Sequence, residues 1–413
     1  MINKLRSIFI AQTTRDALIS FTGLGTIAVA GMIFSIITAR GLGPSLFGIF
    51  SALNALVTLF SSMGDLGISS ALVNFIPKVK DNRNVLISVT FWFQLAVTLT
   101  LTLALMAAGL FNRYLIPGST TTQFIIIGIL TGFYVLQGFA LGIFNAERKF
   151  FQASFIQAMD SIVKLSIVAG LFFNQQLNIE VALIANVISC GLSLIYGFSG
   201  EFRNIRPIFP RAQMTEIFKF SKWIALSRAF SVTISRIDII LLNILSGSFQ
   251  TGIYSAAARI ALLFALLVSS LSSVVAPRFS AFRKNEEMLG YLKKVAAMIG
   301  GISVLMLFTV VIADPLVPWV FGDEYLPAIP VFRALAIAMI PFLLNVVTTQ
   351  PLIYYFNKPQ IFARITILQV IIIVSLDLLL IPRFQAIAPA ISMGVSNLVV
   401  LIITGWQLSR LLK

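Results

Sequence analysis

Basic side chains interrupt several long apolar segments of this chain. They are Lys164, Arg228, Arg236, Arg259 and Arg333, with Arg40 at the end of the first such segment. A charge at the centre of a membrane helix costs about 2.5–3.5 kcal/mol on insertion scales, so each should face the protein interior or water. Guanidinium and ammonium groups bind anions through charge-assisted hydrogen bonds. These residues therefore predict an interior that binds a multiply negative group such as a pyrophosphate.

Acidic residues in the same segments are fewer. Asp160 and Lys164 are four residues apart, so they share one helical face and can pair. Asp238 is two residues from Arg236 and points in another direction, toward a basic residue of another helix such as Arg259. Two roles stay open for Asp160 and Asp238, which are a structural ion pair and ion coupling. The surplus of basic residues favours the anion-binding interpretation for Arg236 and Arg259 above all.

Neutral amide side chains also occur within the apolar segments. An amide can bind a sugar hydroxyl, or it can join two helices for roughly 0.6 kcal/mol. The first interpretation gives a polar cavity lined by Asn54, Gln137, Asn186 and Asn345, with Gln94, Gln157, Gln369 and Asn397 as further members.

Several kinds of chemistry are excluded by what the chain lacks. It contains no His, and its one cysteine, Cys190, lies in an apolar stretch. A disulfide within the chain is impossible, and metal or nucleophilic chemistry based on His or Cys is excluded as well. The sequence therefore predicts no catalytic residue, no metal site and no cofactor.

The composition requires these residues to be carried by membrane helices. Hydrophobic residues make up 58% of the 413 and charged residues only 11%, against about 25% charged in soluble proteins. Crossing a bilayer takes about 20 apolar residues. About twelve windows qualify, near 17–39, 46–76, 85–111, 122–145, 150–173, 179–199, 220–245, 251–277, 291–313, 326–354, 360–381 and 386–409. The predicted fold class is an all-α polytopic membrane protein.

The distribution of positive charge predicts the orientation. Most of the 30 Lys and Arg residues fall in alternate connections, and the other connections hold only Arg40, Arg113 and Arg383. Because Lys and Arg gather on the cytoplasmic side, both termini are expected in the cytoplasm. The net charge of +15 is then mostly topological, and it does not predict nucleic-acid binding.

The two halves of the chain resemble each other. Gly48-Ile-Phe-Ser-Ala opens the second window, and Gly252-Ile-Tyr-Ser-Ala opens the eighth, roughly 200 residues later. A repeat of six spans enters the membrane twice from the same side. We therefore expect two six-helix lobes, residues 1–200 and 219–413, joined by a cytoplasmic linker at 201–218. Related by an axis along the membrane normal, they would enclose a substrate path between them.

Three segments resemble a known family. Residues 39–48 (Ala-Arg-Gly-Leu-Gly-Pro-Ser-Leu-Phe-Gly) resemble the signature that follows the first span of polysaccharide transporters, and Gly64-Asp65-Leu66-Gly67 resembles an Asp-x-Gly turn of their second span. Asp238 followed by Gly252–Ala257 is similar to their seventh and eighth spans. On these motifs the chain is identified as a member of the Wzx-type oligosaccharide flippases, in the multidrug/oligosaccharidyl-lipid/polysaccharide exporter superfamily.

The resemblance implies a fold and an activity. The expected fold is a V-shaped bundle of twelve helices in the bacterial inner (cytoplasmic) membrane. The expected activity is alternating-access translocation of an undecaprenyl-pyrophosphate-linked oligosaccharide, such as an O-antigen or other polysaccharide repeat unit. The implied partners are this lipid-linked substrate and membrane lipid. Contact with other polysaccharide assembly proteins is left open.

Other functions are weaker alternatives. A MATE-like multidrug exporter has the same fold, but a basic cavity would repel the cationic drugs that such proteins carry. A major-facilitator carrier would show a Gly-x-x-x-Asp-Arg signature between spans two and three, where this chain has Pro77-Lys-Val-Lys-Asp-Asn-Arg83. A membrane-bound polysaccharide polymerase or ligase would need a larger outer loop than the one with Asp314, Asp323 and Glu324.

Overall fold

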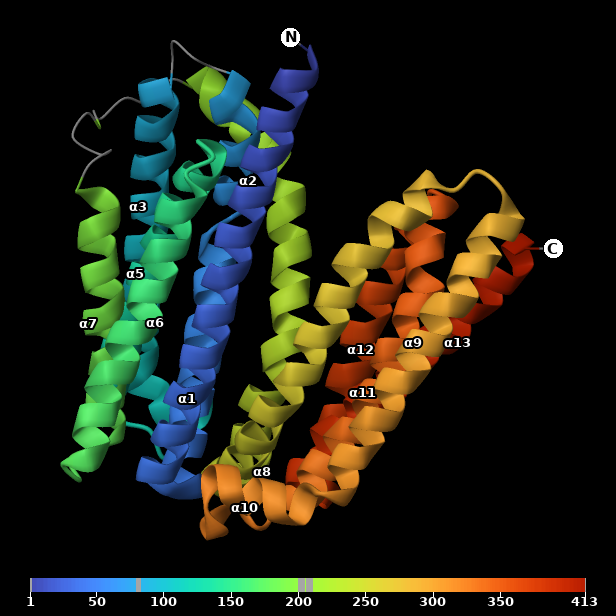
Figure 1. Ribbon diagram of the computed structural model, residues 1–413. Helices are drawn as coiled ribbons and strands as arrows, with labels where there is room; N and C mark the ends of the chain where they lie inside the picture. Colours follow the sequence, from blue (N-terminus) through green and yellow to red (C-terminus); the bar gives the residue numbers. More distant parts are fainter. Residues whose placement is uncertain (1, 79–82, 200–204, 206–210, 413) are drawn as a thin grey trace. The chain divides into compact units, whose positions relative to one another are not determined.

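The computed structural model describes residues 2–78, 83–199, 205 and 211–412, and the secondary structure in these ranges is helical without any strand. The longer helices are α1 (Ile2–Gly64), α2 (Ile68–Phe75), α3 (Arg83–Ala108), α5 (Thr121–Ala146), α6 (Phe150–Phe173), α7 (Ile179–Phe198), α8 (Arg211–Ala281), α9 (Asn285–Val311), α10 (Ala313–Phe321), α11 (Ala328–Gln350), α12 (Pro359–Phe384) and α13 (Ala388–Leu412) (Figure 1). Short helices complete them, namely η1 (Ile76–Lys78), η2 (Gly109–Phe111), α4 (Asn112–Leu115), η3 (Asp323–Tyr325), the π-helix η4 (Pro351–Tyr355) and η5 (Gln385–Ile387). The predicted all-α fold class is confirmed.

The predicted number of spans agrees with the helices. Nine segments of the described chain are long and apolar enough to cross a membrane, and three of these, of 54, 65 and 49 residues, have room for two spans each. Non-helical backbone at Gly43 (φ 71°, ψ 170°) and Gly247 (φ 84°, ψ 174°) divides two of them. The turn η5 divides the third. The described residues therefore provide twelve spans.

The chain folds as two compact units. Unit 1 comprises residues 1–42 and 53–232, and unit 2 comprises residues 43–52 and 233–413. In unit 1, α5 packs against α2, α3 and α7, and α6 packs against α7. In unit 2, α11 and α12 both pack against α13, and α9 packs against α11. Each unit thus has its own helical core.

Half of the predicted linker falls outside the described residues. Positions 201–204 and 206–210 are not described, and α8 already begins at Arg211. Residues 211–218 are therefore helical. The lobe boundaries at 200 and 219 stay a prediction.

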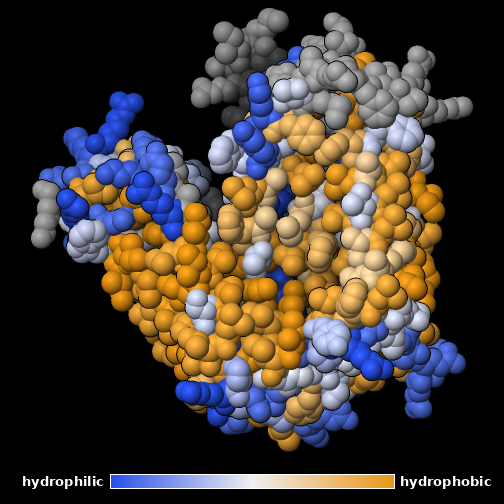
Figure 2. Space-filling model, turned by 180° about the vertical axis from the view of Figure 1, so that it is seen from behind, coloured by the Kyte–Doolittle hydropathy of each residue, from blue (hydrophilic) through white to orange (hydrophobic). Residues whose placement is uncertain are grey.

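Side chains and exposed surface match a membrane environment. Thr120 and Gln123 form a reciprocal cap at the start of α5, with two bonds of 3.2 Å between backbone amides and side-chain oxygens. Because hydrocarbon offers no hydrogen bonds, such internal pairing is required of a spanning helix. On the face shown in Figure 2, hydrophobic side chains cover the middle of each unit, and hydrophilic ones gather toward its ends.

The two sequence repeats meet in unit 2 through a pair of glycines. A Cβ atom at Gly48 would lie 1.8 Å from the Ser248 carbonyl oxygen, and one at Gly252 would lie 1.8 Å from the Pro44 carbonyl oxygen. The contact is reciprocal, as expected of two copies related by a pseudo-two-fold axis. The repeated glycines thus permit a backbone-to-backbone crossing.

Candidate functional site

The helical chain of unit 1 breaks after Gly64, and the break places a carboxylate inside the unit. Between α1 and α2, Leu66 (φ 46°) and Gly67 (φ 74°) adopt left-handed backbone angles, which glycine accepts most readily. The Gln94 amide donates a 2.7 Å hydrogen bond to the Gly64 carbonyl. The carbonyl at the end of α1 is therefore paired within the protein.

Asp65 lies in this break and is tied to α2 and α5. Its side chain is 8% exposed. The Oδ1 atom accepts a 3.3 Å hydrogen bond from the Ser69 backbone amide and also lies next to the Ser69 hydroxyl. That hydroxyl is 3.0 Å from the Gly138 carbonyl of α5, and its single proton can serve either oxygen.

Helix α8 brings an arginine to the same carboxylate. Gly67 allows the approach, because a Cβ atom there would lie only 2.8 Å from the Ser221 carbonyl oxygen. Two turns beyond Ser221, Arg228 donates from Nη1 to Asp65 Oδ2. The Arg228 side chain remains 44% exposed, so it is the accessible half of the pair.

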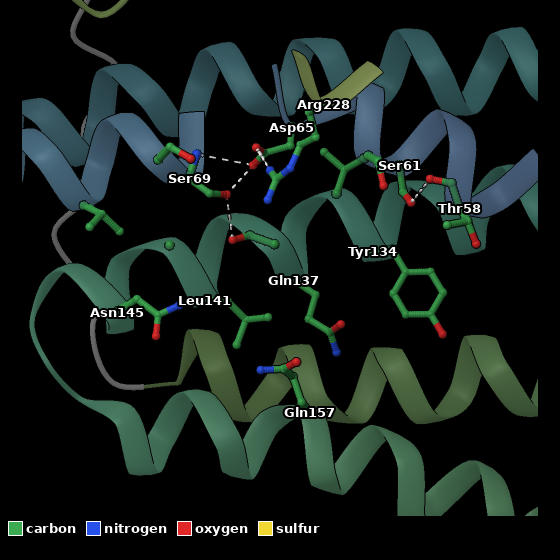
Figure 3. Close-up of a pocket in the computed structure, with 16 residues that line it drawn as sticks. Thr58, Ser61, Asp65, Ser69, Tyr134, Gln137, Leu141, Asn145, Gln157 and Arg228 are labelled. Atoms are coloured by element: carbon green, nitrogen blue, oxygen red, sulfur yellow. Dashed lines mark hydrogen bonds and ion pairs between the residues drawn. The ribbon is translucent and has the colours of Figure 1, made fainter. Parts of the chain in front are cut away.

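A cavity of about 700 Å³ opens beside this ion pair, within unit 1. Figure 3 shows side chains from α1, α2, α5, α6 and α8 around it. Its polar lining consists of Thr58, Ser61, Ser62, Asp65, Ser69, Ser70, Tyr134, Gln137, Asn145, Gln157 and Arg228. Val73, Val135, Gly138, Leu141 and Gly142 complete the wall.

The lining is rich in groups that both donate and accept hydrogen bonds. Hydroxyls and amides can do so, whereas a guanidinium only donates and a carboxylate only accepts. Asp65 and Arg228 are the charged members of the wall, and they are paired with each other. The cavity therefore has a balanced charge and suits a polar, hydroxyl-bearing ligand.

A second polar network adjoins the cavity through Tyr134. Lys164 lies beside the Tyr134 hydroxyl and donates to Asp160 Oδ2 at 2.9 Å. The Ser189 hydroxyl donates to Asp160 Oδ1 at 2.7 Å. The Lys164 and Asp160 side chains are only 14% and 7% exposed. The pairing predicted from their spacing is confirmed.

The amide residues predicted from the sequence take different places. Gln137 and Gln157 line the cavity, and Gln137 also donates to the Ser193 hydroxyl at 2.8 Å. In unit 2, Asn345 donates to the Asn397 carbonyl at 3.2 Å and so joins α11 to α13. A cavity role for Asn345 stays a prediction.

Asn54 and Asn186 are two further candidates from the sequence. Asn186 is buried and donates to the Ala182 carbonyl of its own helix at 2.8 Å. Asn54 is half-buried on α1, where its carbonyl accepts from the Thr58 hydroxyl at 2.8 Å. Neither is among the residues that line the cavity of unit 1, and their cavity role also stays a prediction.

Unit 2 holds a separate group of interior charges. Tyr254, not Arg259, donates a hydrogen bond to Asp238 Oδ2, and the Ile239 amide donates to Oδ1 at 2.8 Å. Arg236 lies within electrostatic range of both Asp238 and Arg259. Its Nε atom is buried and has no hydrogen-bond partner among the described residues. Arg236 thus has a buried donor that no described residue satisfies.

The remaining basic candidates lie apart from both groups. Arg333 of unit 2 donates to Asp314 at 2.7 Å and to the Val310 carbonyl at 3.2 Å. The Arg333 and Asp314 side chains are 40% and 64% exposed. Arg40 of unit 1 is exposed. Neither residue lines the cavity.

The structure adds one acidic partner to the interior charges predicted from the sequence. Asp160 pairs with Lys164 as expected, and Asp65 pairs with Arg228. The sequence did not predict the second pair, because its members are 163 residues apart in the chain. Gly64 and Gly67 on either side of Asp65 indicated a break in the second span, where a buried carboxylate can be accommodated. The anion-binding role of Arg236 and Arg259 stays a prediction.

Comparison with known proteins agrees with this architecture. A Shigella flexneri protein named "Putative O-antigen transporter" is 22% identical over 392 residues, which cover 90% of this chain and 92% of that protein. The solved lipid II flippase MurJ, in an inward closed conformation, matches with a TM-score of 0.79 at 15% identity, covering 95% of this chain and 87% of that one. An inward-facing multidrug resistance MATE family transporter of the MOP superfamily matches with a TM-score of 0.73 at 14% identity, covering 94% and 95%.

The fold and the polar interior define the class as a multi-pass helical membrane protein with the MurJ and MATE fold. Residues 37–330 match the model of a family described as polysaccharide biosynthesis protein. This match covers more than half of the chain. The chain belongs to the polysaccharide biosynthesis protein family.

Proposed function

We propose that this chain is a carrier that moves a lipid-linked oligosaccharide across the cytoplasmic membrane by alternating access, and that it is not an enzyme. The observation that carries the proposal is the polar cavity of about 700 Å³ inside a membrane-embedded helical unit. Family membership supplies the cargo class, because the matching family is described by polysaccharide biosynthesis. The Shigella flexneri relative is named for O-antigen transport.

The physical problem for such cargo is the loss of water. A glycan and its diphosphate would each lose hydrogen bonds on entering hydrocarbon, at several kcal/mol for each unpaired group. A cavity lined by hydroxyls and amides replaces those bonds within the protein. Its volume lies in the range of about 300–1,000 Å³ that is usual for small-molecule sites. The lipid tail stays in the bilayer throughout.

The direction of transport follows from the predicted orientation. With both termini in the cytoplasm, the end of α5 near Asn145 faces the cytoplasm. Asn145 is exposed and lines the cavity. Cargo would enter from that side and leave toward the outer leaflet. Inner-membrane location and cytoplasmic termini belong to this proposal.

The diphosphate of the cargo needs basic groups that are free to bind it. Arg236 and Arg259 are the better candidates, because they lie close together and Arg236 keeps a buried Nε donor without a partner among the described residues. Lys164 and Arg228 are less suited, since each already binds a carboxylate. Asp238 and Asp160 stay candidates for ion coupling.

A multidrug exporter is the second candidate, because the MATE-family structure has the same fold. A likeness in fold does not choose the cargo. The balanced charge of the cavity gives a cationic drug no net attraction. The family match favours the glycan.

A reconstituted assay tests the proposed function. Purified protein is placed in liposomes with a fluorescent undecaprenyl-diphosphate sugar, and a membrane-impermeant quencher reports which leaflet holds the probe. We expect probe to exchange between leaflets faster than in protein-free liposomes. Equal rates with and without protein would contradict the proposal. Drug extrusion without probe movement would favour the MATE-like alternative, and a change in glycan length would favour a polymerase or ligase.

A further inference from the structure

We propose that the cavity of unit 1 is a binding site for uncharged sugar rings and excludes the diphosphate and acidic sugars. This inference rests on the proposed function and assigns one part of the cargo to one place. Its support is the charge balance, the hydrogen-bonding character and the shape of the cavity wall.

The charge balance disfavours an anion in this cavity. Arg228 is the basic residue of the wall, and Asp65 already binds it. A diphosphate that bound the remaining N–H groups of Arg228 would share its single positive charge with the Asp65 carboxylate, which is 8% exposed. Two negative groups would then face one guanidinium, and like charges so close repel each other. An uncharged ligand leaves the pair intact.

The wall offers the hydrogen bonds that sugars use. Ser61, Ser62 and Ser70 bring hydroxyls, and Gln157 and Asn145 bring amides. Ser61 donates its proton to the Thr58 carbonyl at 3.3 Å and can accept from a sugar hydroxyl, whereas the others can donate to one sugar hydroxyl and accept from another. The ion pair adds both kinds of partner, with free guanidinium N–H groups on the 44% exposed Arg228. Such a wall recognises hydroxyls without requiring charge.

One face of α5 forms a long side of the cavity. Tyr134, Gln137, Gly138, Leu141 and Asn145 recur at the spacing of one face of α5. From Tyr134 to Asn145 this face extends roughly 16 Å along the axis. The Tyr134 ring provides an apolar surface with a polar tip, which fits the apolar face of a sugar ring.

Two glycines of α5 set the width of the cavity. At Gly142 a Cβ atom would lie 2.9 Å from the Ser69 Cα atom, so the helices touch there. At Gly138 a Cβ atom would meet nothing within 4 Å, although Gly138 lines the wall. The space next to the Gly138 Cα atom is therefore open on the side that faces the cavity. A large side chain placed there would fill the cavity without displacing the backbone.

The experiment compares three probes with the same fluorescent lipid diphosphate: one bare, one bearing a neutral hexose and one bearing a hexuronate. Transport in proteoliposomes is measured for the unaltered chain and for Gly138→Leu. The unaltered chain should move the hexose probe faster than either other probe. In Gly138→Leu the hexose preference should fall by about tenfold, toward equal rates, as expected when about 1.4 kcal/mol of selective binding is lost.

Gly170→Leu is the matched control, since a Cβ atom at Gly170 also meets nothing within 4 Å and Gly170 is exposed on α6, away from the cavity wall. It should keep the hexose preference. Gln157→Leu, which is nearly isosteric, serves if Gly138→Leu does not fold, with Gln152→Leu of α6 as its control. Both Gln157→Leu and Gly138→Leu should weaken the preference.

The outcomes separate this inference from the proposed function. If the unaltered chain moves no probe, the proposed function itself fails. If it moves probes but Gly138→Leu and Gln157→Leu keep the full hexose preference, the sugar site is wrong while transport stands. If the unaltered chain moves the hexuronate probe as fast as the hexose probe, the exclusion of acidic sugars is wrong.

Discussion

At the scale of single residues, the interior charges of unit 1 occur as neutral pairs. Lys164 binds Asp160, and Arg228 binds Asp65. A lone charge among membrane helices is costly, whereas a paired and hydrogen-bonded one is tolerated. A basic residue inside a span is therefore not by itself a sign of an anionic ligand. Whether such a residue can bind an anion depends on whether a carboxylate already pairs with it.

The Lys164 pair gives a prediction about stability. Lys164→Met leaves the buried Asp160 carboxylate without its cation, and removing one partner of a buried pair costs about 3–5 kcal/mol. We expect less folded protein and a lower unfolding temperature in detergent, measured by fluorescence-detected size exclusion during heating.

The matched control removes both charges. The double variant Asp160→Asn with Lys164→Met should recover most of the lost stability, because no charge is then left unpaired. If the double variant is as unstable as Lys164→Met alone, the ion pair does not explain the effect. A stable double variant that transports normally would also remove Lys164 from the list of substrate-binding candidates.

The arginines of unit 2 give a prediction about transport. Arg236→Ala or Arg259→Ala should lower glycan export while the amount of protein in the membrane stays normal. Lysine at either position should restore part of the activity, because it keeps the charge but not the planar donor geometry. Export is measured as surface glycan in cells that depend on this chain. Normal export in both alanine variants would exclude a diphosphate site at these residues.

At the scale of elements, glycines decide where helices approach. Gly67 lets α8 reach the break that holds Asp65, and Gly48 and Gly252 let two backbones cross in unit 2. Close approach through small residues is the usual way in which membrane helices pack. The position of the polar cavity thus depends on residues that carry no polar side chain.

The crossing in unit 2 gives a prediction about Gly48. In Gly48→Ala the new Cβ atom would lie 1.8 Å from a carbonyl oxygen, so the backbone must move. We expect a clear drop in unfolding temperature and in the yield of folded protein. Gly31→Ala on α1 is the control, because its Cβ atom meets nothing within 4 Å, and it should be neutral or stabilising by up to about 1 kcal/mol. Equal behaviour of the two variants would contradict the close crossing.

At the scale of the whole molecule, the chain is a duplicated set of spans with its positive charge concentrated in alternate connections. The kinks at Gly43 and Gly247 recur in the two repeats. A repeat of six spans keeps both halves in the same orientation. From the charge bias we predict that one set of connections lies in the cytoplasm.

The orientation can be tested with single cysteines. Cys190 is buried, and replacing it by serine gives a chain without thiols. A cysteine at exposed Gln176, between α6 and α7, should react with a membrane-impermeant maleimide in intact cells. A cysteine at exposed Glu286, at the start of α9, should react only after the membrane is opened. The reverse pattern would contradict cytoplasmic termini.

The sequence by itself determined the helical membrane fold, the number of spans and the Lys164–Asp160 pair. Composition and charge bias report on the solvent around each segment, and i,i+4 spacing is a local property of a helix. Such information needs no knowledge of which helices become neighbours. These features can therefore be inferred without knowing the tertiary structure.

Only the tertiary structure decided which polar residues face one another. Asp65 and Arg228 are far apart in the chain, and Gln137 lines the cavity whereas Asn345 joins two helices. In the sequence these amides look alike, because each is one polar residue in an apolar helix. Which helix lies opposite depends on close packing at particular glycines. In unit 1 that packing brings Arg228 to Asp65, beside a cavity of balanced charge.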